Sequence, residues 1–180
     1  RPLSLGLYEV DKGYVVPQAS HPAYIPTMNA LCKREDVQVL ITGSEAELRA
    51  VSASRQKFSD IGVLPLINSL RVIELCMNKW ETHQFLHEKG FHTPACVLLE
   101  DLSACAQVQR LPVVIKPAVG GGGSNLTFIA QDREELEFFA KYILKLGGLP
   151  MAQEYIGTPR DEYTVGVLTT FEGELVGSIA

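Results

Sequence analysis

The chain has 180 residues, of which 46% are hydrophobic and 21% are charged. These proportions are typical of a folded globular protein, not of a disordered one. The formal net charge of -5 argues against a nucleic-acid-binding surface as the main function. No apolar run reaches the ~18 residues that a membrane span needs, and no signal peptide is recognisable, so we expect a cytoplasmic protein.

Neither the four cysteines nor the four histidines show the spacing of a metal site. We therefore expect reduced, partly buried thiols and no metal ligands among them. The chain begins at Arg1 and stops at LVGSIA, which reads as an unfinished strand, so we expect a piece of a larger protein.

Short strands and helices alternate along the first part of the chain. Strands are predicted at 14–16, 37–42 and 63–67, and helices at 22–35, after Ser44, and from Ser69 to about 77. This alternation predicts an α/β fold with a parallel sheet. The segment TGSE at 42–45 lies at the carboxyl end of a strand, where such sheets bind ligands; a simple turn with a helix cap remains an equal alternative.

A new helix is predicted to begin after Asn78, because Asn78 and Glu81 have the spacing of an N-cap and its capping box. Lys79 then lies in the first turn, where the helix dipole disfavours a cation by roughly 0.3–1 kcal/mol. This lysine is either solvated or directed at an anion beyond the helix. Gly90 is predicted to end the helix.

The remaining elements are predicted from apolar runs and turn residues. We expect a strand at 96–99, a short helix at 102–109, and a strand that ends at Lys116, just before the proline and the glycines. A strand follows at 126–130, and Asp132 with Glu135 caps an amphipathic helix ended by Gly147 and Gly148. The last predicted elements are a strand at 151–156 and a hairpin around Glu172-Gly173.

The stretch VVIKPAVGGGGSN at 113–125 is compatible with few phosphate-binding designs. A P-loop requires its lysine after the glycines, and here Lys116 precedes them. A dinucleotide fingerprint requires a helix after the glycines, and here a strand-like LTFIA follows, with Asn125 at the third glycine position.

A glycine-rich hairpin over a nucleotide fits best, because bare backbone N–H groups can approach phosphate oxygens while Lys116 supplies charge. A merely flexible hairpin remains the alternative.

With these motifs the chain resembles the ATP-grasp superfamily, in particular its carbamoyl-phosphate-synthetase large-subunit-like and carboxylate–amine ligase branch. The resemblance extends through essentially all 180 residues. It rests on four blocks in the order and spacing of the family: ITGSEAEL, NKWETHQFLHEKGFHTP, PVVIKPAVGGGGSN and AQEYIGTPRDEYTVGVL. It implies a truncated Rossmann-like pre-ATP-grasp domain at 1–77, followed by the N-terminal, nucleotide-binding half of an ATP-grasp domain at 78–180.

The resemblance also implies roles for matching residues. Lys79 and Lys116 resemble the two nucleotide lysines, and Glu162 resembles the carboxylate that binds the ribose hydroxyls. The loop that closes on the phosphates would be Gly121, Gly122, Gly123 and Ser124. The hinge that reads adenine would be Gln153, Glu154, Tyr155 and Ile156, with the backbone carbonyl of Glu154 accepting from the exocyclic amine and the Ile156 N–H donating to a ring nitrogen. Solvated carboxylates at Glu154 and Glu162, and a Gln153 that contacts no ligand, remain alternatives.

The implied cofactors are ATP and Mg²⁺, and the family's magnesium ligands and acyl-phosphate arginine would lie downstream of Ala180. Gly166 occupies a position that is acidic in several relatives, which leaves one substrate-side contact in doubt.

The implied activity is that of an ATP-dependent ligase, with this chain alone inactive. It would activate a carboxylate or bicarbonate as an acyl-phosphate for attack by an amine or ammonia, as in carbamoyl-phosphate synthesis. The alternatives are a non-catalytic nucleotide-binding module of the same fold and a dinucleotide oxidoreductase. Expected partners are ATP and a small-molecule substrate, with a possible homodimer, and neither nucleic acid nor a membrane.

Overall fold

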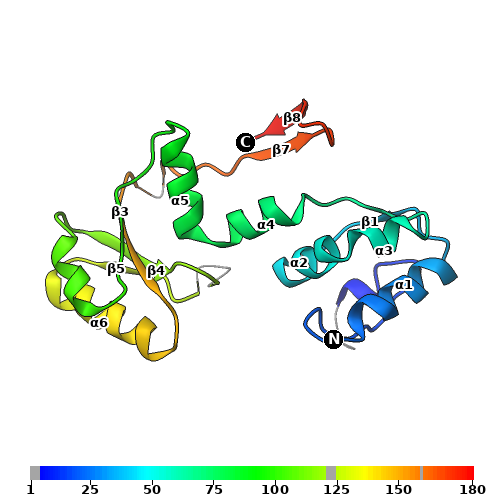
Figure 1. Cartoon of the computed structure of the whole chain (residues 1–180), viewed down its shortest axis with the longest axis horizontal. Helices are drawn as coiled ribbons and strands as arrows, with labels where there is room; N and C mark the ends of the chain where they lie inside the picture. The colour runs from blue at the N-terminus through cyan, green and yellow to red at the C-terminus, as the bar shows by residue number, and fades with distance from the viewer. Residues whose placement is uncertain (1–4, 121–124, 159) are drawn as a thin grey trace. The chain divides into compact units, whose positions relative to one another are not determined.

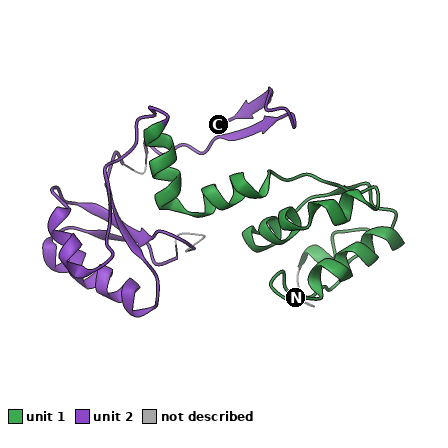
Figure 2. Cartoon of the chain, viewed as in Figure 1, with its two compact units in different colours: residues 1–88 green, residues 89–180 purple. Residues whose placement is uncertain are grey.

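The structure is a computed structural model that describes residues 5–120, 125–158 and 160–180. Its contacts divide the chain into two compact units, residues 1–88 and 89–180 (Figure 2). The predicted domain boundary at 77/78 stays a prediction. Within the described residues, no helix combines the length and apolar character that crossing a membrane requires.

The first unit contains short helices and a small parallel sheet (Figure 1). Strands β1 (Val39–Leu40) and β2 (Leu64–Pro65) pair in parallel, with Val39 opposite Leu64. The other elements in chain order are η1 (Leu5–Leu7), α1 (Tyr24–Arg34), α2 (Glu45–Ala53), α3 (Arg55–Ser59), α4 (Leu70–Met77) and α5 (Lys79–Glu88). The prediction of parallel pairing is thus confirmed for two short strands.

Two of the predicted helix starts, after Ser44 and Ser69, are confirmed by their caps. The Ser44 side chain accepts from the Glu47 N–H at the start of α2, and Ser69 accepts from the Val72 N–H at the start of α4. Such caps satisfy N–H groups that have no partner within the helix.

One predicted strand is wrong and two are shorter than predicted. Residues 14–16 form no strand, and Val15 is 61% exposed. The predicted strands at 37–42 and 63–67 reduce to the two residues each of β1 and β2. An apolar run becomes a strand only where a second segment pairs with it through backbone hydrogen bonds, and that segment is distant in the sequence.

The core of the first unit packs α1, α2 and α3 against residues that flank β2. Its buried side chains are Tyr24, Cys32, Val51, Phe58, Val63 and Ile67. The Tyr24 hydroxyl donates to Glu47 Oε1 at 3.2 Å. Burial, and then the nearby Glu47 carboxylate, raise the pKa of Tyr24 to about 12.

The second unit contains an antiparallel sheet of four strands in the order β3-β6-β4-β5. These strands are β3 (Cys96–Leu98), β4 (Val113–Pro117), β5 (Phe128–Ala130) and β6 (Pro150–Glu154). A short 3₁₀ helix, η2 (Leu102–Gln107), replaces the predicted helix at 102–109. The central strands β4 and β6 pair over five residues, from Val113 opposite Glu154 to Pro117 opposite Pro150.

Helix α6 (Arg133–Lys145) covers one face of this sheet. Its predicted cap is confirmed, because Asp132 Oδ1 accepts from the Glu135 N–H at 2.9 Å. Leu136, Ala140 and Ile143 are fully buried against Val113 and Ile115 of β4. The predicted glycine end is confirmed too: Gly147 has φ +78°, and the Gly148 N–H donates to Ile143 O at 3.1 Å.

The predicted terminal hairpin is also present. Strands β7 (Gly166–Thr169) and β8 (Leu175–Ile179) pair antiparallel around Gly173, whose φ is +91°. A positive φ at this turn position suits glycine. Residues on both faces of the hairpin are exposed, among them Val167 and Val176.

Candidate nucleotide site

The four-stranded sheet of the second unit has two chemically different faces. Side chains alternate along β4, so that Val113, Ile115 and Pro117 are buried while Val114 and Lys116 are half-buried. Of the buried set, Val113 and Ile115 pack against α6. Lys116 is therefore held at the end of β4 on the face that α6 does not cover.

The register assigns neighbouring residues to the Lys116 face. Gln153 of β6 lies opposite both Val114 of β4 and Cys96 of β3, and paired residues of an antiparallel sheet share a face. We call the set Cys96, Val114, Lys116 and Gln153 the lysine face. Two predicted nucleotide residues, 37 positions apart in the sequence, thus come onto one surface.

The predicted hairpin around the glycines is supported by the strands on either side of them. β4 and β5 pair antiparallel, with Ile115 opposite Phe128. Gly121, Gly122, Gly123 and Ser124 lie outside the described residues. The next described residues, 125–130, form a turn and a strand. The helix that a dinucleotide fingerprint needs is therefore not there.

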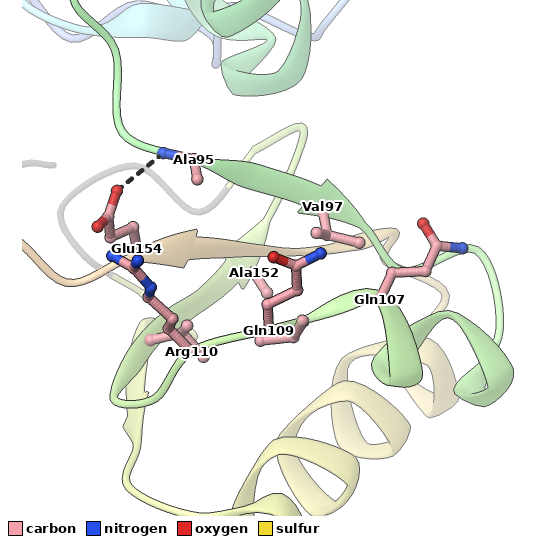
Figure 3. Close-up of a pocket in the computed structure, with 9 residues that line it drawn as sticks. Ala95, Val97, Gln107, Gln109, Arg110, Ala152 and Glu154 are labelled. Atoms are coloured by element: carbon pink, nitrogen blue, oxygen red, sulfur yellow. Dashed lines mark hydrogen bonds between the residues drawn. The ribbon is translucent and has the colours of Figure 1, made fainter.

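The predicted adenine hinge begins at the end of β6, where Glu154 makes two contacts with Ala95. The Glu154 N–H donates to Ala95 O at 2.8 Å. The Ala95 N–H donates in turn to Glu154 Oε2 at 3.2 Å (dashed in Figure 3), and not to the main-chain carbonyl as a regular ladder would have it. The Glu154 carboxylate thus accepts the hydrogen bond that the main-chain carbonyl of Glu154 would accept in a regular ladder.

The rest of the predicted hinge is exposed. Tyr155 is 37% exposed and Ile156 is 66% exposed, and Glu162, the predicted ribose carboxylate further along the chain, is exposed as well. Between them, Asp161 Oδ2 accepts from the N–H and the hydroxyl of Thr158, at 2.9 and 2.8 Å. These bonds lower the pKa of Asp161 and form a small turn that leads from Ile156 toward Glu162.

Lys79 belongs to the first unit and is the first residue of α5. The predicted cap is confirmed: Asn78 Oδ1 accepts from the N–H groups of Trp80 and Glu81, each at 3.2 Å. Asn78 Nδ2 donates to Glu81 Oε1 at 2.7 Å. Lys79 is half-buried. The capping box between Asn78 and Glu81 fixes it in the first turn of α5.

The lysine face contains one group that sequence reasoning did not assign, the thiol of Cys96. Burial raises its pKa to about 11, and the nearby Lys116 charge opposes that shift. A thiol this hard to ionise is not a nucleophile at neutral pH. Nothing in the sequence near Cys96 indicates this neighbourhood, because Gln153 and Lys116 reach it only through strand pairing.

A metal site would need several His, Cys, Asp or Glu side chains close together. Among residues 5–120, 125–158 and 160–180, no group of three or more His, Cys, Asp or Glu side chains is arranged to hold an ion.

The fold is that of an α/β protein, and comparison with known families defines the class further. The family described as "ATP-grasp domain" matches residues 76–177, and "PylC-like, N-terminal domain" matches residues 1–67. The chain therefore belongs to the ATP-grasp family.

Known proteins agree with this assignment. A D-alanine–D-alanine ligase from Fusobacterium nucleatum is 30% identical over 136 residues, which are 75% of this chain and 40% of the ligase. The chain thus spans about two fifths of that relative.

Solved structures show the same fold. A biotin carboxylase–β-γ-ATP complex from Campylobacter jejuni superimposes with a TM-score of 0.63 at 18% identity, over 85% of this chain and 37% of that one. An L-amino acid ligase from Bacillus licheniformis gives a TM-score of 0.59 at 21% identity, over 82% and 34%. The Hydrogenobacter thermophilus 2-oxoglutarate carboxylase biotin carboxylase domain, a dimer in complex with MgADP, gives 0.61 at 19% identity, over 83% and 36%.

Proposed function

We propose that this chain is the ATP-binding portion of a ligase that activates a carboxylate as an acyl-phosphate for attack by an amine or ammonia. The observation that supports it most is the lysine face: Lys116 is the penultimate residue of β4, the strand before the glycines, and the predicted adenine hinge follows from β6, the strand paired with β4. Phosphates and base would then lie along one sheet surface.

The individual roles follow from chemistry and position. Lys79 and Lys116 would neutralise phosphate charge, and the N–H groups of Gly121, Gly122, Gly123 and Ser124 would donate to phosphate oxygens. The backbone from Gln153 through Tyr155 to Ile156 would line the adenine, and Glu162 would accept from the ribose hydroxyls.

The contact between Ala95 and Glu154 supports the hinge assignment. Because the Ala95 N–H donates to the Glu154 carboxylate, it does not compete for the carbonyl of the same residue. That carbonyl can accept from the exocyclic amine of adenine, which is the contact that distinguishes adenine from a base with a carbonyl at this position.

In the proposed reaction, a carboxylate oxygen attacks the γ-phosphorus, the bond to the β-phosphate oxygen breaks, and ADP leaves. The amine then attacks the acyl carbon and releases phosphate. Phosphoryl transfer depends on positioning and on the stabilisation of negative charge. The lysines and backbone N–H groups of this chain would supply both for the phosphates of the bound nucleotide. Magnesium, when bound, would neutralise phosphate charge, and no described residue is assigned as its ligand.

The acceptor carboxylate is proposed by analogy with a relative. The 30% identity to a D-alanine–D-alanine ligase supports the carboxylate of an amino acid. Bicarbonate, as in a carbamoyl-phosphate-synthetase-like enzyme, is the second candidate, supported by the resemblance of the four sequence blocks.

Calorimetric titration tests the nucleotide site. We expect the chain to bind ATP and ADP but not NAD. Lys116→Ala should weaken ATP binding by about tenfold or more, because hydrogen bonds to charged groups contribute about 1.5–3 kcal/mol. Lys141→Ala is the matched control, because it removes a positive charge from the solvent-exposed side of α6.

Equal ATP affinity in the two variants would refute the role of Lys116. Phosphate release by the intact protein with amino acids or bicarbonate then tests catalysis. ATP binding without acceptor-dependent release would instead indicate a non-catalytic nucleotide module.

A further inference from the structure

A pocket of about 290 Å³ lies on the sheet of the second unit, on the face opposite Lys116 (Figure 3). Its floor contains Val97 and Ala152, which pair with each other in the register, and Val113. These residues alternate with Cys96, Gln153 and Val114 of the lysine face, so the pocket opens away from the proposed nucleotide.

The rim of the pocket carries its polar groups. Arg110 and Glu154 lie at one end and Gln107 lies at the other (Figure 3). Among the described residues, the carboxylates in ion pairs with lysine or arginine are Glu35 and Glu74. Within that part of the chain, Arg110 and Glu154 therefore form no ion pair, although they lie at the same end of one pocket.

The chemistry of this pocket indicates the class of ligand. A guanidinium binds a carboxylate, and the Glu154 oxygen that is not bonded to Ala95 can accept from an ammonium. One positive and one negative group at the same end match a molecule that carries both charges on neighbouring atoms. The floor is built of short aliphatic side chains, which suits an aliphatic group.

We propose that this pocket binds an aliphatic α-amino acid, on the face of the sheet opposite the proposed nucleotide site, with Glu154 contributing its carboxylate here and its main-chain carbonyl to the hinge. The ligand's carboxylate contacts Arg110, its ammonium contacts Glu154, and its side chain covers Val97, Val113 and Ala152. Small-molecule sites usually measure about 300–1,000 Å³, so a pocket at the lower end of that range fits a single amino acid.

Methyl NMR can distinguish the two faces of the sheet. Ile129 of β5 pairs with Val114 and so lies on the same face as Lys116. Titration of the labelled chain with L-leucine should shift the methyl signals of Val97, Val113 and Ala152, and leave those of Val114 and Ile129 in place. ATP should shift the second group, so this proposal and the nucleotide proposal can fail separately.

Charge variants and analogues test the recognition. Arg110→Gln should weaken leucine binding by about tenfold or more, while Lys141→Gln should not change it. With the unaltered chain, 4-methylpentanoate, which lacks the ammonium, and 3-methylbutylamine, which lacks the carboxylate, should each bind about tenfold or more weaker than leucine.

Three results would overturn the proposal. They are an absence of methyl shifts with leucine, shifts confined to Val114 and Ile129, and analogues that bind as well as leucine. The analogue comparison uses the unaltered chain, so it stays decisive even if Arg110→Gln fails to fold.

Discussion

Glu154→Ala tests whether the carboxylate of Glu154 keeps the hinge carbonyl available for adenine. In the structure, Glu154 Oε2 accepts from the Ala95 N–H at 3.2 Å. Without the carboxylate, that N–H has the main-chain carbonyl of residue 154 as its nearest alternative acceptor, since the Ala95 carbonyl already accepts from the N–H of residue 154. The carbonyl would then be shared between Ala95 and the adenine amine.

The expected loss follows from the value of one hydrogen bond. A net contribution of about 0.5–1.5 kcal/mol corresponds to ATP binding that is about twofold to twelvefold weaker. Inosine triphosphate has a carbonyl in place of the exocyclic amine, so it does not use this contact. Its affinity should stay constant, and the preference for ATP over inosine triphosphate should fall.

Calorimetric titration of both nucleotides measures this preference. Glu137→Ala on the exposed side of α6 is the matched control and should change neither affinity. Glu154→Gln keeps an acceptor oxygen and should give an intermediate result. The reasoning is refuted if Glu154→Ala weakens both nucleotides equally, or if it leaves the preference for ATP unchanged.

The remaining predictions concern stability and thiol reactivity. Asp132→Ala removes the cap of α6 and should cost about 1 kcal/mol in urea unfolding, whereas Gln131→Ala beside it should cost little. Leu136→Ala empties a fully buried site and should cost about 2–5 kcal/mol, against little change for Phe138→Ala, which is 65% exposed. Because burial raises the pKa of Cys96 from the usual 9.0 to about 11, its thiolate is scarce below pH 11. Iodoacetamide should therefore label Cys96 at pH 9 about fifty times more slowly in the folded chain than in urea, and equal rates would contradict the shift.

Helix starts were predictable because their causes are local. Ser44, Ser69 and Asn78 each accept from a backbone N–H two or three residues further on, and Asp132 does the same for α6. A side chain and a donor so close in sequence meet whenever the helix forms. The glycine end of α6 and the turn at Gly173 are local in the same way, since each depends on one residue with positive φ.

Strands were less predictable, because a strand exists only through a partner. Residues 14–16 have the apolar pattern of a strand and form none, and the run at 37–42 pairs over two residues alone. The order of strands in the second sheet, with β6 between β3 and β4, also depends on pairings between distant segments.

The sequence by itself determined the alternation of helices and strands, the caps, and the succession of lysine, glycines and a second strand, because each depends on neighbours in the chain. The tertiary structure decided which side chains share a surface. Pairing across β3, β6 and β4 brings Cys96, Gln153 and Lys116 onto one face and directs Glu154 to the other, toward Ala95 and the pocket beside Arg110. A shift of one residue in that register would exchange the two faces, and strand pairing, which fixes the register, is a property of the folded chain.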